Sequence, residues 1–207
     1  MDSLVRGKAP GARGRPRLVV GISGASGVVY GVRMLQALRR MGVETHLVMS
    51  RSAQVTLAHE TDMKVHEVQA LADVCHSNAD IGASISSGSF PALGMVVAPC
   101  SIKTLSEVAT GCTSSLLSRA ADVTLKERRR LVLMVRETPL HAGHIHSMAM
   151  ATQAGAVICP PVPAFYARPQ SLEEMVDHTI GRVLDLFGLE SGTVKRWTME
   201  EALMAHE

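Results

Sequence analysis

The chain has 207 residues, enough for one α/β domain with a substantial core. With 46% hydrophobic residues, 19% charged residues and a formal net charge of +2, its composition is that of a soluble globular protein without general affinity for nucleic acid. Four cysteines without a Cys-x-x-Cys pair indicate neither a zinc knuckle nor a disulfide framework, so we expect free thiols and a cytoplasmic protein. No apolar stretch approaches the roughly 18 residues of a membrane span.

Residues 1–16 are basic and rich in glycine and proline, and they lack the apolar segment of a signal peptide. We expect a disordered tail there. Strands and helices alternate over residues 17–188 without a linker or repeat, which predicts a single domain with one parallel sheet covered on both faces. Residues 189–207 are polar around Trp197, and we expect them to form a tail that docks on a neighbouring subunit.

The first strand, predicted over residues 17–22, runs into a turn that contains Gly24 and Gly27. Apolar residues at helical spacing follow, so we expect a helix to begin near Ser26. Free N–H groups at such a helix N-terminus would suit a phosphate. The spacing matches neither the dinucleotide nor the Walker pattern, however, and an ordinary tight turn is an equal alternative.

The second strand, predicted over residues 43–49, ends at Ser50. A dinucleotide-binding fold usually has an acidic residue there to hold the adenosine ribose, so this serine argues against NAD. Helices are predicted over residues 52–59 and 65–72. Glu60, between them, has a solvated side chain as its plain interpretation.

The small, polar stretch 84–90 is predicted to be a flexible loop of the kind that closes over ligands. A short strand over residues 94–98 follows and ends in Pro99-Cys100-Ser101, before another helix. A buried strand that leads into a hydroxyl-rich turn is a second candidate edge for ligand binding.

The next helix is predicted over residues 116–126, with Arg119 and Lys126 outside its apolar stripe. It ends in the charged run 127–130, which we expect to be a solvated helix end. A strand over residues 131–135 then stops at Arg136-Glu137, a pair that could bind a ligand or form a structural ion pair.

Histidines 141, 144 and 146 raise the question of a metal site, but no matching acidic residue accompanies them, and we expect no metal. A strand is predicted over residues 156–159. Prolines stiffen the following loop, which holds Phe165 and Tyr166, and this loop either contacts a ligand or packs on the sheet edge. A capping box at Ser171 starts the last helix. Its predicted buried stripe begins at Leu172 and leaves Arg182 facing solvent.

These polar clusters follow the ends of parallel strands, which face one crevice. Such a site could bind a phosphorylated cofactor through backbone amides and hydroxyls, and a second anion through lysine and arginine. Residue pattern alone leads no further.

Six blocks of the sequence resemble the signature motifs of the UbiX-type flavin prenyltransferases, formerly described as aromatic acid decarboxylases. The resemblance runs from about Arg17 to Trp197. The blocks are Gly24-Ala25-Ser26-Gly27, Glu60-Thr61-Asp62, Pro99-Cys100-Ser101, Arg119 to Val123 with Leu125 to Arg129, Arg136 to His141, and Pro160 to Gln170.

The resemblance implies a Rossmann-like, flavodoxin-type three-layer α/β sandwich that assembles as a homododecamer with active sites between subunits. It implies a metal-independent reaction in which the dimethylallyl group of dimethylallyl phosphate is joined to N5 and C6 of reduced FMN. The product, prenylated FMN, is the cofactor of UbiD-type decarboxylases, including the one in ubiquinone biosynthesis.

The resemblance also assigns residues. The FMN contacts fall on Gly24, Ala25, Ser26, Ser50, Ser101, Ile102, Lys103, Thr104, Arg119 and Arg136. The groups around the prenyl phosphate fall on Lys126, Arg136, Tyr166 and Arg182, whose charges and hydroxyl would stabilise the departing phosphate. Glu137 would handle a proton on that phosphate, while Ser26 and Glu60 would support proton movement near the flavin.

The chain departs from the family pattern at two places. Arg130 replaces a common proline, and Ser114-Ser115 replaces a pair that usually contains Asn or Asp, close to the expected site. Two other functions stay open: an FMN-dependent cysteine decarboxylase of the same superfamily, and a non-catalytic FMN carrier. A carrier would have no use for a second anion site with Lys126, Tyr166 and Arg182.

Overall fold

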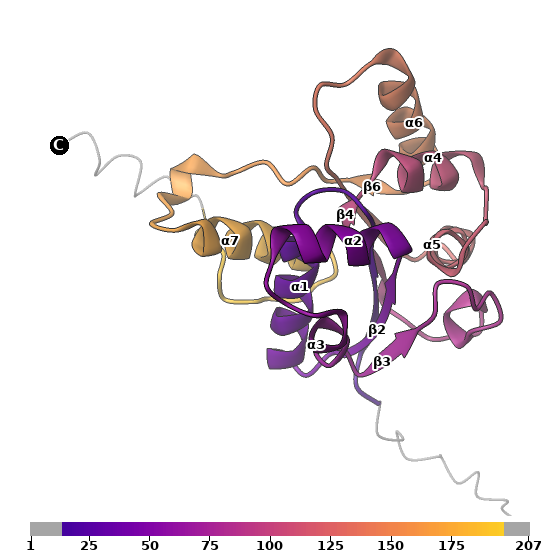
Figure 1. The fold of residues 1–207 in the computed structure, drawn as a ribbon, viewed down its shortest axis with the longest axis horizontal. Helices are drawn as coiled ribbons and strands as arrows, with labels where there is room; N and C mark the ends of the chain where they lie inside the picture. The colour runs from indigo at the N-terminus through magenta and orange to yellow at the C-terminus, as the bar shows by residue number, and fades with distance from the viewer. Residues whose placement is uncertain (1–13, 197–207) are drawn as a thin grey trace, which may run out of the picture.

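The computed structural model describes residues 14–196, which form a parallel six-stranded sheet with helices on both faces (Figure 1). This architecture confirms the predicted α/β class. The strands are β1 (Arg17–Ile22), β2 (Glu44–Met49), β3 (Val74–His76), β4 (Gly94–Cys100), β5 (Arg130–Val135) and β6 (Val157–Ile158). The α-helices are α1 (Val28–Arg40), α2 (Arg51–Glu60), α3 (Val65–Gln69), α4 (Ile102–Thr110), α5 (Leu116–Lys126), α6 (Ala142–Gln153) and α7 (Leu172–Asp185), and the short 3-10 helices are η1 (Ser84–Ser86) and η2 (Phe165–Ala167).

The strands lie in the order β3-β2-β1-β4-β5-β6, which is the Rossmann order. The order reverses between β1 and β4, and ligands of such sheets bind beyond the carboxyl ends of these two strands. The sequence predicts five of the six strands. It misses β3, which has only three residues and pairs with β2 at the sheet edge, where Val74 and Cys75 stay exposed.

The two faces of the sheet bury separate hydrophobic clusters because successive strand residues point to opposite sides. In β1, Leu18 and Val20 belong to the cluster under α1 and α7, and Val19 belongs to the cluster under α4 and α5. Helix α1 contributes Leu35 and other residues with no exposed surface, which confirms the predicted apolar stripe.

Two predicted surface features differ in the structure. Stretch 84–90 is not a flexible loop, because η1 buries Ile85 against the cluster that includes α5. In α7, Leu172 lies outside the buried stripe and is 74% exposed, although Val176, Ile180 and Val183 are buried as expected. Leu172 is in the first turn of α7, directly after the extended segment 159–171, which we call the arm. A leucine at this position can face away from the sheet.

The predicted capping box of α7 forms only in part. The Ser171 side chain accepts a hydrogen bond from Glu174 N–H, as predicted. The Glu174 carboxylate, however, accepts from Gln170 N–H at 2.7 Å, one residue before the cap. The interaction still satisfies a backbone donor at the helix start.

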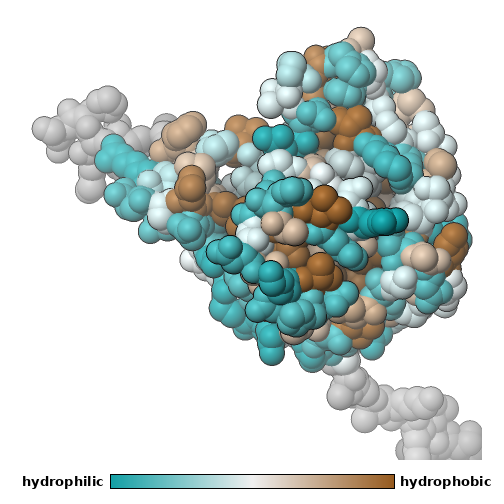
Figure 2. All heavy atoms as spheres, in the orientation of Figure 1, coloured by the Kyte–Doolittle hydropathy of each residue, from teal (hydrophilic) through white to brown (hydrophobic). Residues whose placement is uncertain are grey.

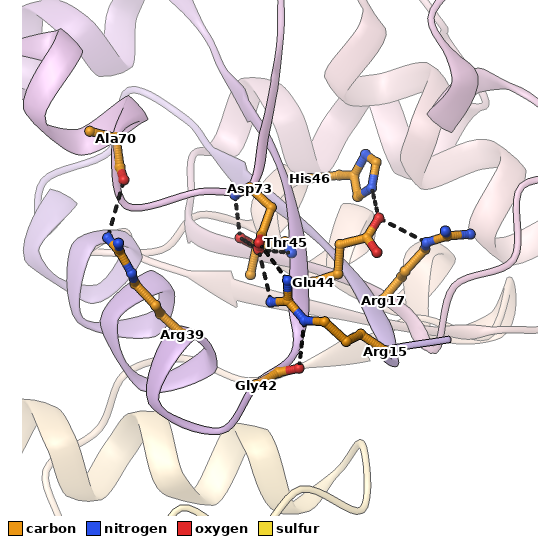
Figure 3. Close-up of polar contacts among 9 residues, drawn as sticks. All are labelled: Arg15, Arg17, Arg39, Gly42, Glu44, Thr45, His46, Ala70 and Asp73. Atoms are coloured by element: carbon orange, nitrogen blue, oxygen red, sulfur yellow. Dashed lines mark hydrogen bonds and ion pairs between the residues drawn. The ribbon is translucent and has the colours of Figure 1, made fainter. Parts of the chain in front are cut away.

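A network of hydrogen bonds and ion pairs lies at the edge of the sheet where β1 and β2 begin (Figure 3). The Asp73 carboxylate accepts hydrogen bonds from Thr45 and Arg15, and Glu44 lies between His46 and Arg17. Residues 14–16, which the tail prediction included, are therefore anchored to the domain. Residues 189–196, the described start of the predicted docking tail, lie against α7 of the same chain, where Arg196 pairs with Asp185 and Thr193 donates to Asp177 O at 3.1 Å. Residues 1–13 and 197–207 lie outside the described residues.

The surface in Figure 2 is mostly hydrophilic on the face shown, with hydrophobic side chains scattered over it. Within residues 14–196, no helix is long and apolar enough to cross a membrane. The most exposed large apolar side chains, Val162, Phe165 and Leu172, lie on or beside the arm before α7. Phe165, at 75% exposure, is therefore not packed on the sheet edge.

Candidate functional site

Four polar segments meet at the carboxyl ends of the central strands, as the sequence predicts. Ser50 N–H donates to Ile22 O at 3.0 Å, which joins the ends of β2 and β1. Arg136 N–H donates to Cys100 O at 3.0 Å, which joins the ends of β5 and β4. The candidate site is this edge of the sheet.

The turn after β1 is held by Glu60, at the end of α2. The Glu60 carboxylate accepts hydrogen bonds from Gly27 N–H at 2.9 and 3.0 Å and from Val28 N–H at 2.9 Å. Gly27 has a φ of 98°, which favours glycine, and α1 begins at Val28. The prediction of free N–H groups at this helix N-terminus is therefore wrong, because an internal carboxylate binds them. Ser26 is not the helix cap.

The charge on Glu60 is stabilised by this arrangement. Burial acts to raise its pKa, but hydrogen bonds from Ser26, Val28 and Gly27, together with the positive charge of Arg136, outweigh burial and hold the pKa below its ordinary value. Glu60 is thus a carboxylate at neutral pH that is exposed, as the plain interpretation expects, but also bound to the glycine turn. Burial also raises the pKa of the nearby Tyr30 phenol, and the charge of Arg136 partly offsets that effect.

The N-terminus of α4 is the second helix start at this edge. Ser101 caps the helix, and its side chain accepts a hydrogen bond from Thr104 N–H at 3.3 Å. The N–H groups of Ile102 and Lys103, in the first turn, have no partner within an α-helix. The Lys103 side chain points to Glu107 and binds it at 2.6 Å. The backbone of α4, more than the Lys103 side chain, is therefore the candidate anion-binding element.

The loop of Gly24 approaches α2 closely. A Cβ atom added at Gly24 would lie 2.3 Å from the Ser52 Cβ atom, so only glycine fits. Thr56 donates a hydrogen bond to Gly24 O at 3.2 Å, and the Ser50 hydroxyl caps α2 by accepting from Ala53 N–H. These contacts fix the loop against the start of α2.

Arg136 and Glu137 follow β5 and do not form an ion pair with each other. Glu137 accepts a hydrogen bond from Thr138 N–H at 3.0 Å. Within residues 14–196, the exposed Arg136 side chain takes part in no ion pair, whereas Lys103, Arg119, Lys126 and Arg182 each pair with a carboxylate. Arg136 thus forms no ion pair in the described part of the chain, although its charge acts on the Glu60 carboxylate, and its backbone lies beside the start of α4.

Lys126 lies at the opposite edge of the sheet from Arg136. Helix α5 begins beside Asn78, which follows β3, because Leu116 N–H donates to Asn78 O. It ends beside Gly88, before β4, where a Cβ atom would lie 2.7 Å from the Lys126 amino group. Six residues of strand span about 20 Å, so one chain does not bring Lys126 to the site.

Three other predicted residues have partners elsewhere. Arg119 pairs with Asp122 one turn along α5, and Arg182 pairs with Asp185 on α7. Tyr166, on η2, packs edge-to-face against His178 with ring centroids 5.8 Å apart. Figure 1 shows the orange arm running from β6 to α7, and α7 lies on the side of the sheet away from α4 and α6.

The positions that depart from the family pattern have simple structural roles. Ser114 binds Glu107, and Ser115 caps α5 by accepting from Ser118 N–H. Arg130 is the exposed first residue of β5 rather than part of a helix end. His141 caps α6, and the described residues contain no group of three or more possible metal ligands.

The comparisons with known proteins agree with this fold. The family model described as Flavoprotein matches residues 7–184. Flavin prenyltransferase UbiX of Escherichia coli K12 is 64% identical over 174 residues, which cover 84% of this chain and 92% of the relative. The chain belongs to the UbiX-type flavin prenyltransferases. This membership confirms the resemblance read from the sequence motifs.

Two solved structures of this flavin prenyltransferase family are similar throughout. AnUbiX (PadA1), in complex with FMN and dimethylallyl pyrophosphate, has a TM-score of 0.88 and 53% identity and covers 89% of this chain and 98% of its own. A dodecameric, FMN-dependent UbiX-like decarboxylase from Escherichia coli O157:H7 has a TM-score of 0.86 and 49% identity, with coverages of 88% and 99%.

Sequence reasoning missed three contributors to the site: Ser23, Tyr30 and Thr56. Ser23 precedes the glycine turn. Its hydroxyl forms hydrogen bonds with Pro99 and Ser101 at the end of another strand, which the sequence does not reveal. Tyr30 could have been noticed as one of only two tyrosines in a chain with 3% aromatic residues.

Proposed function

We propose that this flavin prenyltransferase joins the dimethylallyl group of dimethylallyl phosphate to N5 and C6 of reduced FMN, and so makes prenylated FMN for a UbiD-type decarboxylase. The observation that carries this proposal is the open N-terminus of α4 at the Rossmann switch point, with Arg136 beside it at the end of β5. A helix N-terminus and a free guanidinium are the groups that bind phosphate esters.

The residues present fit FMN. The capped N-terminus of α4 offers the hydroxyls of Ser101 and Thr104 and the first-turn N–H groups to a phosphate. Gly24, Ala25 and Ser26 lie one strand away and would face the flavin ring from the loop after β1, which packs against Ser52 of α2 because Gly24 has no Cβ atom. The α1 N-terminus is filled by Glu60 and is not the phosphate site.

When bound, reduced FMN supplies the nitrogen and carbon atoms to which the prenyl group is joined. Ser26 and Glu60 would hold and move a proton on the ring side of the site, because the Ser26 side chain bonds to a carboxylate whose pKa is lowered. Arg119 pairs with Asp122 at 2.7 Å, and it would contact FMN only after this ion pair breaks.

The departing phosphate needs positive charge and a proton carrier. Arg136 would bind it, and the exposed Glu137 carboxylate would exchange a proton with it. Tyr166 and Arg182 would add a hydroxyl and a second guanidinium from the arm and α7. Lys126 would come from another copy of the chain, because within one copy it lies at the far edge of the sheet.

This geometry supports an oligomer in which neighbouring copies complete each site, in line with the dodecameric Escherichia coli structure. The exposed arm residues Val162 and Phe165 are the apolar contacts that such an assembly would bury. We further propose that the protein works in the cytoplasm without a metal and hands its product to a decarboxylase there.

The test is an anaerobic incubation of the purified chain with reduced FMN and dimethylallyl phosphate, followed by mass spectrometry of the flavin. We expect the flavin mass to increase by one five-carbon unit. Lys126→Met and Glu137→Gln should keep FMN binding and lose the product, while Arg130→Met, a nearby exposed cation, serves as control. Bound but unmodified FMN in the wild type would favour the carrier function, and full turnover in either variant would refute that residue's role.

A further inference from the structure

Ser23 is a buried hydroxyl at the centre of the site. It follows β1 directly, precedes Gly24, and its residue is 1% exposed. Its hydroxyl donates to Pro99 O at 2.8 Å and accepts from Ser101 N–H at 2.7 Å. The Ser23 hydroxyl is therefore both a donor and an acceptor to other residues of the chain. Its two hydrogen bonds join the ends of β1 and β4 at the switch point.

The two partners of Ser23 belong to different halves of the proposed flavin site. On one side the backbone continues into the loop Gly24–Gly27, which would face the flavin ring. On the other side Ser101 caps α4, whose first turn would bind the flavin phosphate. A second contact, from Ser23 N–H to Pro99 O at 3.2 Å, strengthens the same junction.

We propose that Ser23 is a positioning residue that sets the separation between the ring-binding loop and the phosphate-binding turn, and thereby the preference for FMN over riboflavin. The inference rests on the proposed function, because it takes the α4 N-terminus as the phosphate site. Ser23 does not touch the ligand. It acts through Ser101, whose hydroxyl contacts Thr104 Oγ1 at 3.2 Å.

The chain offers a matched control at the opposite edge of the sheet. Thr45 has no exposed surface, and its hydroxyl also accepts from a backbone N–H, that of Asp73, and donates to an oxygen, Asp73 Oδ2, both at 3.1 Å (Figure 3). Thr45→Val removes two hydrogen bonds of the same kind as those lost in Ser23→Ala. Thr45 lies about one strand length from the site.

The experiment measures the dissociation constants of oxidised FMN and of riboflavin by fluorescence quenching, together with melting temperature, for the wild type and both variants. We expect Ser23→Ala to weaken FMN binding about tenfold and riboflavin binding less than about threefold, since the variant loses two buried hydrogen bonds, each worth up to roughly a factor of ten, and only part of this loss reaches the phosphate-binding turn. Thr45→Val should lower the melting temperature and leave both dissociation constants unchanged. Ser23→Cys, with a weaker donor of similar shape, should give an intermediate FMN-to-riboflavin ratio.

Equal weakening of both flavins by Ser23→Ala, or an unchanged ratio in Ser23→Ala and Ser23→Cys, would overturn the inference and leave a purely structural hydroxyl. If Ser23→Ala does not fold, the ratio in Ser23→Cys decides alone. A wild type that binds FMN no better than riboflavin would also overturn it. A wild type that binds neither flavin would instead contradict the proposed function.

Discussion

The contacts of Glu60 lead to a prediction about stability and its pH dependence. Glu60→Gln keeps the shape of the side chain and removes its negative charge from the N-terminus of α1. The carboxylate accepts from Gly27 N–H and Val28 N–H within 3.0 Å, and the neutral amide keeps only one oxygen for these donors. The folded protein should therefore lose stability at neutral pH.

The magnitude follows from the helix dipole and the hydrogen bonds. A charge at a helix terminus contributes about 0.3–1 kcal/mol, and a hydrogen bond to a charged group contributes about 1.5–3 kcal/mol. The amide keeps part of the second contribution, and solvent screens this exposed side chain. We therefore expect a loss of about 1 kcal/mol, which corresponds to roughly 2–4 °C in melting temperature for a domain of this size.

The sign of the pH dependence is fixed by the lowered pKa of Glu60. Because the pKa in the folded state lies below the ordinary value of 4.5, the charge adds stability above about pH 4.5, and this stability is lost as pH falls through the folded pKa. The difference between wild type and Glu60→Gln should be full at about pH 7 and should shrink below about pH 4.5.

The assay is thermal unfolding followed by circular dichroism across this pH range, with the exposed Glu190→Gln as a control expected to stay within about 0.5 kcal/mol of wild type. Equal melting temperatures of wild type and Glu60→Gln at pH 7 would refute the reasoning. So would a difference that grows as the pH is lowered.

Two further predictions concern the core. Leu35→Ala, at a side chain with no exposed surface, should cost about 2–5 kcal/mol of unfolding free energy in urea denaturation, whereas Leu172→Ala, at 74% exposure, should cost under about 0.5 kcal/mol. A large effect of Leu172→Ala on the unfolding of the single chain would contradict its exposed position. Burial raises the pKa of the Cys100 thiol, so a thiol reagent at pH 8 should label exposed Cys112 well before Cys100, as peptide mass mapping would show. Equal labelling rates in the folded protein would contradict this assignment.

Local sequence patterns were enough to predict most of the fold. The strand over residues 17–22 and the stripe of α1 depend on continuous apolar runs and on helical spacing, and both appear at the predicted positions. Strand β3 could not be predicted because its pairing with β2 comes from the tertiary fold and not from its three residues. Leu172 likewise follows the helical spacing of a core residue, but the arm before α7 directs it to solvent.

The candidate site was predictable as an edge and less so as a set of contacts. That Ser50, Ser101 and Arg136 share one edge follows from a parallel sheet, since each directly follows a strand. That Glu60 fills the α1 N-terminus depends on the packing of α2 beside the glycine turn, which sequence spacing does not encode. The distance between Lys126 and Arg136 likewise becomes visible only when α5 is seen to run back along the sheet.

If each site combines Arg136 of one copy with Lys126 of another, two inactive variants should restore each other in mixed oligomers. Lys126→Met and Arg136→Gln, each inactive alone, would be unfolded together, refolded and assayed for prenylated FMN, with mixed assembly verified by native mass spectrometry. Mixed oligomers should regain part of the wild-type activity, because some sites then receive both intact residues from different copies. Mixed oligomers that form and stay inactive would show that Arg136 and Lys126 do not act together across subunits.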